Sequence, residues 1–233
     1  MDKKTFQRVL AAVLHDYPVR DWTRQMDPFE ILVAVVISQN TTVQNERRAL
    51  RNLRASLGIT PERIAAAGLG VLEEALRPAG LYVAKARWLK AIAQHLLDRH
   101  GGDLRRLIRP PLERARQALM DLEGIGPKTA DVVLAMVEDY PTMPVDTHIA
   151  RIARRWEIGP GRSYEEVTEA LKAWIPPDRR REAHLALIRF GRETCTARRP
   201  KCPSCPVAPH CPFLRQIRAG EIQIPLHEPS GRT

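Results

Sequence analysis

Residues 122–133 read LEGIGPKTADVV, and two glycines in this stretch separate two segments of helical periodicity, 115–121 and 127–136. Glycine adopts the left-handed backbone of a tight turn without steric cost, and Pro127 suits the first position of a helix. The stretch therefore predicts two helices joined by a short turn.

The backbone N–H groups of this turn and of the second helix's first turn form a site for one phosphate, which is a sequence-independent grip on DNA. A nucleotide-binding P-loop is excluded, because the G-x-x-x-x-G-K-[ST] pattern is absent and no strand precedes the turn. An ordinary helical hairpin with a solvated lysine remains open. Lys128 lies in the first helical turn, where the helix dipole disfavours a cation.

The chain has 233 residues, with 37 Lys and Arg against 27 Asp and Glu, for a formal charge of +10. This balance favours a polyanionic partner such as nucleic acid, although a merely basic surface is compatible with charge alone. The first 18 residues have neither the apolar core nor the cleavage site of a signal peptide. We expect no membrane association, no targeting signal, and a cytoplasmic, nucleoid-associated protein.

Helical periodicity and helix-capping residues run along nearly the whole chain, whereas strand signals are almost absent. The fold class is therefore predicted to be all-α. The segment after Cys211 is rich in proline, glycine and polar residues and is predicted to be a loose end.

The cysteines are crowded into one C-x6-C-x2-C-x5-C loop and comprise Cys195, Cys202, Cys205 and Cys211. This crowding favours metal or cluster ligation over a disulfide framework. The spacing lacks the two C-x2-C pairs of a zinc ribbon, but four thiolates alone leave zinc and iron–sulfur open.

Asp146 follows a proline-punctuated loop and precedes a helical segment, so it is predicted to be a helix N-cap. A catalytic role requires a partner. One helix and one loop separate Asp146 from Lys128, and we expect them to return the carboxylate toward the amine.

Taken together, LEGIGPKTADVVL, VDTHIARI and the cysteine loop resemble the endonuclease III family of helix-hairpin-helix DNA glycosylases, in order and spacing. The resemblance runs from Phe29 to Cys211. It implies two helical domains flanking a DNA cleft, with a C-terminal [4Fe-4S] cluster loop. The implied boundaries are a helical barrel at 24–138, with the hairpin at about 114–136, a cluster domain formed by 1–23 plus 139–212, and a tail at 213–233.

By this resemblance Lys128 is the nucleophile that attacks C1′ of the damaged nucleotide, displaces the base and forms a Schiff base that leads to β-elimination. A nucleophilic amine must be neutral, and the positive end of a helix dipole disfavours the ammonium form. Asp146 assists deprotonation or stabilises positive charge on the sugar. Monofunctional adenine glycosylases of the superfamily lack this lysine, so Lys128 indicates AP (apurinic/apyrimidinic) lyase activity.

The resemblance also implies which residues contact DNA. Base chemistry in a duplex requires the nucleotide to be extruded and the gap to be filled. Gln39 corresponds to the residue that enters the stack, and Leu81 to the wedge on the opposite strand, although a core leucine is the alternative from sequence alone. The remaining expected DNA contacts are Thr41, Gly124, Gly126, Thr129, Arg198, Arg199 and Lys201. The four cysteines are the expected cluster ligands.

The expected substrate is double-stranded DNA with damaged bases or abasic sites, handled by a monomer. Oxidised pyrimidines are the expected class of damaged base. The segment ISQNTT also resembles relatives that excise alkylated purines, and mismatch-specific enzymes are a further possibility. Pro127 replaces a basic residue often found before the lysine and removes one N–H donor. A noncatalytic, cluster-bearing DNA-binding protein is the alternative from another functional class.

Overall fold

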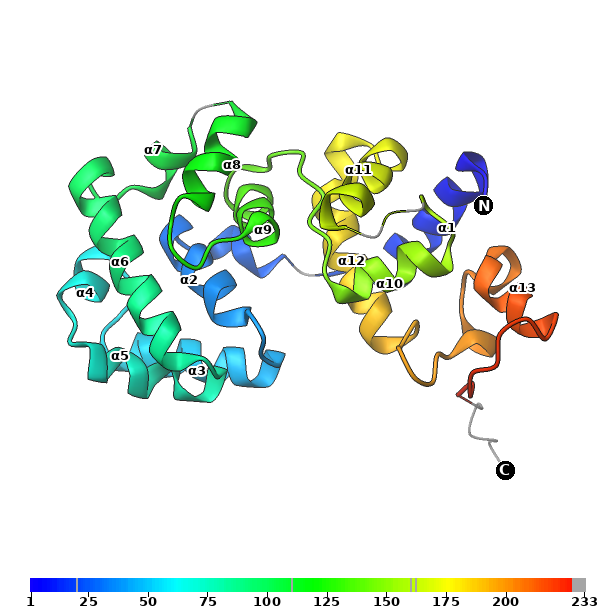
Figure 1. Cartoon of the computed structure of the whole chain (residues 1–233), viewed down its shortest axis with the longest axis horizontal. Helices are drawn as coiled ribbons and strands as arrows, with labels where there is room; N and C mark the ends of the chain where they lie inside the picture. Colours follow the sequence, from blue (N-terminus) through cyan, green and yellow to red (C-terminus); the bar gives the residue numbers. More distant parts are fainter. Residues whose placement is uncertain (20, 110, 160, 162, 228–233) are drawn as a thin grey trace. The chain divides into compact units, whose positions relative to one another are not determined.

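The computed structural model describes residues 1–19, 21–109, 111–159, 161 and 163–227. Every regular element in these residues is a helix, which confirms the all-α prediction. The chain forms two compact units: the inner unit, Trp22–Tyr140, and the terminal unit, Met1–Asp21 with Pro141–Thr233 (Figure 1). None of the described helices combines the length and the apolarity needed to cross a membrane.

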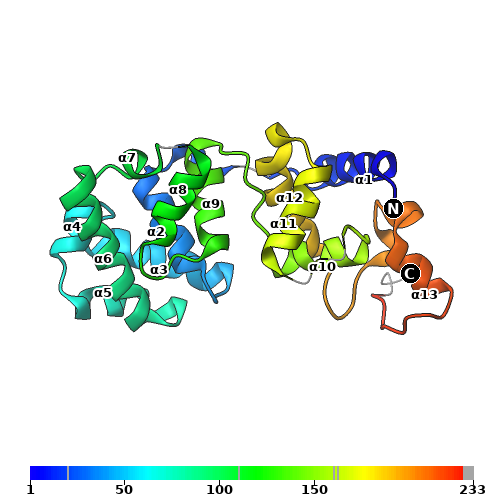
Figure 2. The ribbon, with the colours of Figure 1, turned by 45° about the horizontal axis from the view of Figure 1, so that its top comes forward.

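The inner unit contains eight α-helices and two short 3-10 helices within its described residues. These are η1 (Trp22–Gln25), α2 (Pro28–Ser38), α3 (Val43–Ser56), α4 (Pro61–Ala66), α5 (Leu69–Leu76), η2 (Arg77–Ala79), α6 (Tyr82–His100), α7 (Leu104–Ile108), α8 (Leu112–Met120) and α9 (Pro127–Glu138). Helix α2 is buried at nearly every position and packs against α3, α6 and α9. Figure 2 shows α8 and α9 side by side, as the turn between them requires.

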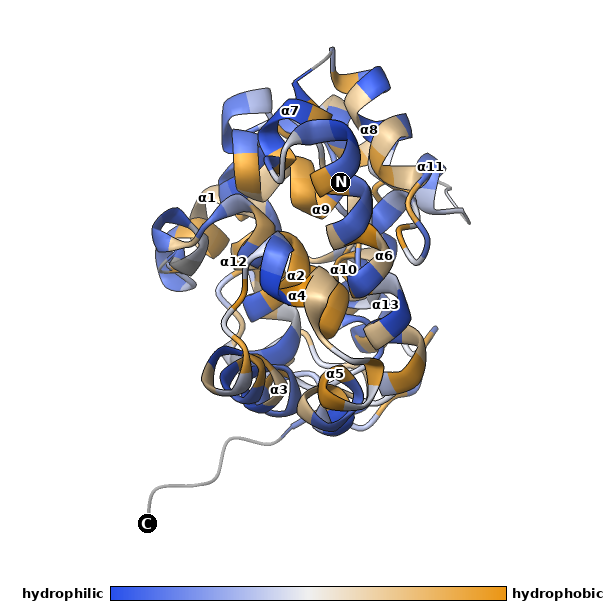
Figure 3. Ribbon diagram, turned by 90° about the vertical axis from the view of Figure 1, so that its left-hand side faces the viewer, coloured by the Kyte–Doolittle hydropathy of each residue, from blue (hydrophilic) through white to orange (hydrophobic). Residues whose placement is uncertain are grey.

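The remaining helices of the inner unit differ in polarity according to how much of each faces the core. Helix α3 is largely hydrophilic and buries only Ala49, Leu50 and Leu53, whereas α5 is largely apolar (Figure 3). Both α4 and α5 pack against the long helix α6. This packing holds the start of α6, and the Leu81 loop before it, against the core of the unit.

The terminal unit combines the N-terminal helix with the C-terminal helices. Its elements are α1 (Lys3–Asp16), α10 (Thr147–Arg155), α11 (Tyr164–Trp174), η3 (Pro177–Arg179), α12 (Arg180–Glu193), η4 (Cys202–Ser204), η5 (Ala208–His210) and α13 (Pro212–Arg218). Phe6 of α1 is fully buried and packs edge-on against Trp156 and Trp174. The Tyr17 and Thr194 hydroxyls share a 2.6 Å hydrogen bond, which ties the C-terminal end of α1 to the C-terminal end of α12.

The prediction of a loose end after Cys211 is wrong for its first part. Helix α13 occupies Pro212–Arg218, and Leu214 is only 4% exposed. Its neighbour Phe213 lies under the guanidinium of Arg155, 4.4 Å from the ring centroid. These partners come from a distant helix, so the local composition alone does not indicate them. Residues 228–233 of the predicted tail lie outside the described residues.

Candidate nucleic-acid site and catalytic residues

Of the two glycines in the turn between α8 and α9, only Gly124 occupies a position that requires glycine. Gly124 has a φ of +83°, and a Cβ there would lie 2.3 Å from a ring atom of Trp88. The indole Nε1 of Trp88 donates to Glu123 at 3.2 Å, so α6 supports the turn directly. Any side chain at Gly124 would displace this support.

Gly126 has a different role from the one expected for both glycines. Its φ is −93°, which any residue adopts, and an added Cβ would meet nothing within 4 Å. Gly126 is the N-cap of α9 and supplies no side-chain capping bond. The absence of a side chain therefore leaves space at the N-terminus of α9, as a phosphate contact there requires.

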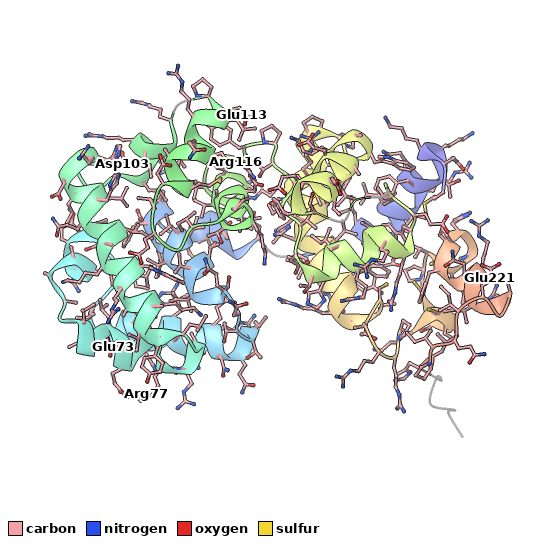
Figure 4. The ribbon with its side chains drawn as sticks, viewed as in Figure 1. Glu73, Arg77, Asp103, Glu113, Arg116 and Glu221 are labelled. Atoms are coloured by element: carbon pink, nitrogen blue, oxygen red, sulfur yellow. The ribbon has the colours of Figure 1, made fainter. Side chains whose placement is uncertain are left out.

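Helices α8 and α9 are also joined by a partly buried ion pair. The Arg116 guanidinium of α8, labelled in Figure 4, donates from Nε to Asp131 at 2.8 Å. Asp131 lies on α9, is 3% exposed, and follows Lys128 by three residues. The pair fixes the first turns of α9, and with them Lys128, relative to α8.

Lys128 is exposed in the first turn of α9, which contains no acidic residue. Among the residues that the structure describes, no hydrogen-bond or ion-pair partner of its ammonium group is found. The amine therefore faces solvent at the positive end of the helix dipole. An exposed amine in this position is accessible to a substrate.

The structure brings Gln39 to the same turn. Its side-chain Nε2 donates to the Gly124 carbonyl at 3.0 Å and to the Thr129 hydroxyl at 3.1 Å. Thr129 is 8% exposed, so this polar contact is largely shielded from water. Gln39, Gly124 and Thr129, all expected DNA contacts, form one connected group.

Leu81 lies in the loop before α6 and is 54% exposed, which excludes the alternative of a core leucine. Its φ of +50° places a branched side chain in the left-handed region, where non-glycine residues are rare. Thr41 is half-buried just before α3, and no side-chain contact of it is described.

Lys85 is a residue of this region that sequence reasoning missed. It is fully buried, and its Nζ donates to the carbonyls of Ile37, Gln39 and Ala79. Burial lowers its pKa to about 8. The sequence feature that indicates its burial is its position in the apolar stripe of α6, beside Ala86 and one turn before Leu89.

Asp146 belongs to the terminal unit and is the N-cap of α10, as the sequence predicts. Its Oδ1 accepts from the Ile149 backbone N–H at 2.8 Å, and the residue is half-buried. It also lines a cavity of about 580 Å³ formed with α10 and α11. Lys128 lies in the inner unit, so the expected approach of the two side chains stays a prediction.

His148 lies two residues after Asp146 and shares its helix. Burial lowers its pKa below the ordinary value, and the nearby charge of Asp146 opposes that shift. A guanidinium nitrogen of Arg151 donates to its Nδ1 at 3.1 Å. The neutral imidazole is therefore the form that fits this surrounding at neutral pH.

Cys195 follows α12, whereas Cys202, Cys205 and Cys211 lie at the ends of η4 and η5, and none of the four forms a disulfide. Burial raises the pKa of Cys202 to about 11 and of Cys205 to about 12, and it raises that of Cys211. The charges of other cysteines add to each of these three shifts. Within the described residues, no group of three His, Cys, Asp or Glu side chains is gathered closely enough to hold a metal ion.

Arg155 organises the start of the cysteine loop and was also missed from sequence. It is 8% exposed and donates to the Cys195 Sγ at 3.1 Å, the Thr196 carbonyl at 2.8 Å and the Ala197 carbonyl at 3.1 Å. The basic residues that follow are accessible: Arg198 and Arg199 are exposed and Lys201 is half-buried. The loop thus exposes cationic side chains, while Arg155 binds its backbone carbonyls.

Comparison with known proteins decides which family these features belong to. The profile described as "HhH-GPD superfamily base excision DNA repair protein" matches residues 33–177. The chain belongs to the HhH-GPD superfamily. The matched residues include Gln39, Lys128 and Asp146, whereas the four cysteines lie beyond them.

Among HhH-GPD relatives, Endonuclease III of Escherichia coli K12 is 35% identical over 190 residues, 82% of this chain and 86% of the relative. Endonuclease III of Thermotoga maritima is 32% identical over 200 residues, 86% of this chain and 90% of the relative. A solved structure of a trapped Endonuclease III–DNA covalent intermediate matches with a TM-score of 0.82 and 31% identity, covering 94% of this chain and 99% of the other. A thermostable thymine-DNA glycosylase, 22% identical with a TM-score of 0.76, shares the fold.

Proposed function

We propose that this protein is a base-excision-repair DNA glycosylase with AP-lyase activity on double-stranded DNA. The observation that carries this function is Lys128, an exposed amine at the N-terminus of α9 directly after the glycine turn. The similarity to Endonuclease III, for which a covalent DNA intermediate has been trapped, supports the same chemistry here. A binding protein needs no such nucleophile.

In the proposed reaction, the neutral Lys128 amine attacks C1′ of the damaged nucleotide, and the C1′–N bond to the base breaks. The base leaves with the bonding electrons, takes up a proton, and the sugar ring opens to give an iminium ion on Lys128. Loss of a C2′ proton then expels the 3′ phosphate by β-elimination, and water releases the enzyme. Asp146 serves this sequence by accepting the amine proton or by stabilising the positive sugar.

Extrusion of the base leaves a gap in the stack that side chains must fill. The Gln39 loop and the exposed Leu81 loop are the two segments proposed for this task. Thr41, Thr129 and the backbone at Gly124 and Gly126 are proposed to contact the strand beside it. This division separates the groups that open the duplex from the group that reacts.

Oxidised pyrimidines are the proposed lesion class. We expect strand cleavage at thymine glycol and 5-hydroxycytosine to exceed cleavage at 3-methyladenine or a G·T mismatch by about 100-fold. Single-turnover cleavage of otherwise identical duplexes measures the ratio. Preference for 3-methyladenine would favour the alkylpurine alternative suggested by ISQNTT, and preference for G·T the mismatch alternative.

The Asp146 carboxylate has both a capping and a chemical role, and two substitutions separate them. Asp146→Asn keeps an oxygen that accepts from Ile149, so stability should change little, while removal of the charge should slow the reaction about 100-fold. Asp146→Ala should additionally lose about 1 kcal/mol of stability. Thermal melts and single-turnover rates give both values. Full activity in Asp146→Asn would confine Asp146 to capping.

The four cysteines are proposed to hold a [4Fe-4S] cluster. The donor set fits by its chemistry, since four free thiols lie in one loop, 195–211, and Arg155 donates to the Sγ of Cys195. When bound, the cluster supplies structural cross-linking of the loop. Arg198, Arg199 and Lys201 would then be held for phosphate contact. We propose that the protein acts as a monomer on chromosomal DNA in the cytoplasm.

A further inference from the structure

The buried ammonium group of Lys85 has three N–H donors and three acceptors. Nζ donates to the carbonyls of Ile37 at 2.8 Å, Gln39 at 2.7 Å and Ala79 at 3.0 Å. A protonated lysine is therefore completely satisfied in this place, whereas a neutral amine has one donor too few.

These carbonyls come from two separate loop regions. Ile37 and Gln39 close the C-terminal end of α2, where carbonyls lack intrahelical partners and the helix dipole favours a cation. Ala79 ends η2, two residues before Leu81. Lys85 thus connects the loop that carries Gln39 to the loop that carries Leu81.

Both loops contain a non-glycine residue in the left-handed region. Asn40 has a φ of +52° and Leu81 a φ of +50°. Such backbone conformations persist only where the surroundings hold them. In each loop, a carbonyl bound by Lys85 lies one or two residues from the strained position, so Lys85 is placed to provide that restraint.

A lysine is a costly way to fill a core position, because burial disfavours its charged form. That cost lowers the Lys85 pKa to about 8, and among the described residues Glu46 of α3 is the charged group whose field acts against this shift. An apolar side chain would fill the same volume without the penalty. What it cannot do is bind carbonyls from both loops at once.

We propose that Lys85 is a positioning residue that locks the Gln39 loop to the Leu81 loop, so that the two side chains enter a duplex as one preformed unit. The inference rests on the proposed function for its role on DNA. The restraint of the two loops by Lys85 concerns the free protein alone, so one experiment tests this restraint without DNA and another tests the role on DNA.

The first experiment measures amide hydrogen exchange in the free protein for wild type, Lys85→Met and Lys90→Met. Lys90 is the matched control, because it lies on the same helix and donates to the carbonyls of Ala65 and Ala67, away from both loops. In Lys85→Met the amides of Gln39 and Gly80 should exchange about tenfold faster or more. Unchanged exchange, or equal loosening in Lys90→Met, would overturn the proposal.

The second experiment measures base extrusion by the fluorescence of 2-aminopurine beside a lesion. Lys85→Met should slow extrusion in duplex DNA about tenfold, while borohydride trapping on a single-stranded abasic oligonucleotide stays near wild type, since it has no opposite strand and no gap to fill. Equal losses on both DNAs would mean general destabilisation and would refute the positioning role. If the wild-type protein neither extrudes the base nor forms a trapped adduct, the proposed function is wrong. Hydrogen exchange in the free protein still tests whether Lys85 holds the two loops together.

A test without substitution follows from the titration of Lys85 itself. Lysine 13Cε signals should show one side chain with a midpoint near pH 8, absent in Lys85→Met. Above that pH one carbonyl loses its donor, so the amide signals of Gln39 and Leu81 should shift with the same midpoint. If the amide signals of Gln39 and Leu81 do not shift with this midpoint, the proposal is contradicted, even if the Lys85→Met variant fails to fold.

Discussion

Replacement of Lys128 by arginine is expected to remove the borohydride-trapped adduct with abasic DNA while leaving DNA affinity close to that of wild type. Arginine keeps the positive charge but remains protonated and cannot form a Schiff base. Because Lys128 is exposed, the substitution leaves the core of the inner unit untouched. Lyase turnover should fall on the order of 1,000-fold or more.

Lys128→Ala is the companion variant, because it removes charge and nucleophile together. Its affinity for DNA should fall and become less sensitive to salt, by about one phosphate contact. Both variants should melt at the wild-type temperature. A persisting adduct in Lys128→Arg would assign the nucleophile to another amine, and no adduct with wild type would leave a monofunctional or purely binding role.

Replacement of Cys202 by serine is expected to remove the broad visible absorbance of an iron–sulfur cluster and to unfold the cysteine loop. Cys202 is 8% exposed, so its environment is suited to a ligand that is shielded from water. Metal-binding free energy in small loops is largely folding free energy, so loss of one ligand should cost several kcal/mol locally. Hydrogen exchange should rise sharply in η4, η5 and α13.

Ser204→Ala is the matched control within the same loop. Its hydroxyl donates to the Lys201 carbonyl at 3.4 Å and is not a proposed ligand, so iron content and colour should be retained. Iron and acid-labile sulfide measured per chain distinguish a cluster from zinc. A colourless wild type with bound zinc would replace the cluster assignment, and full colour in Cys202→Ser would remove Cys202 from the ligand set.

Several features of the site follow from interactions between residues close in sequence. Asp146 caps α10 by accepting from the amide three residues on, and Pro127 occupies the first position of α9. Their partners lie within one helical turn, so residue type and order predict them. The two glycines show the limit of this reasoning: only Gly124, pressed against Trp88 of a distant helix, requires glycine.

Sequence by itself determined the all-α class, the capped helices, the hairpin around 122–133 and the cysteine spacing, because each depends on local periodicity or order. Tertiary structure alone decided the contacts of Lys85 and Arg155 and the helical start of the segment after Cys211. Lys85 binds carbonyls as far as 48 residues away, and Arg155 binds Cys195, 40 residues away. Such partners depend on how helices pack, and no local pattern encodes which carbonyl a buried cation will meet.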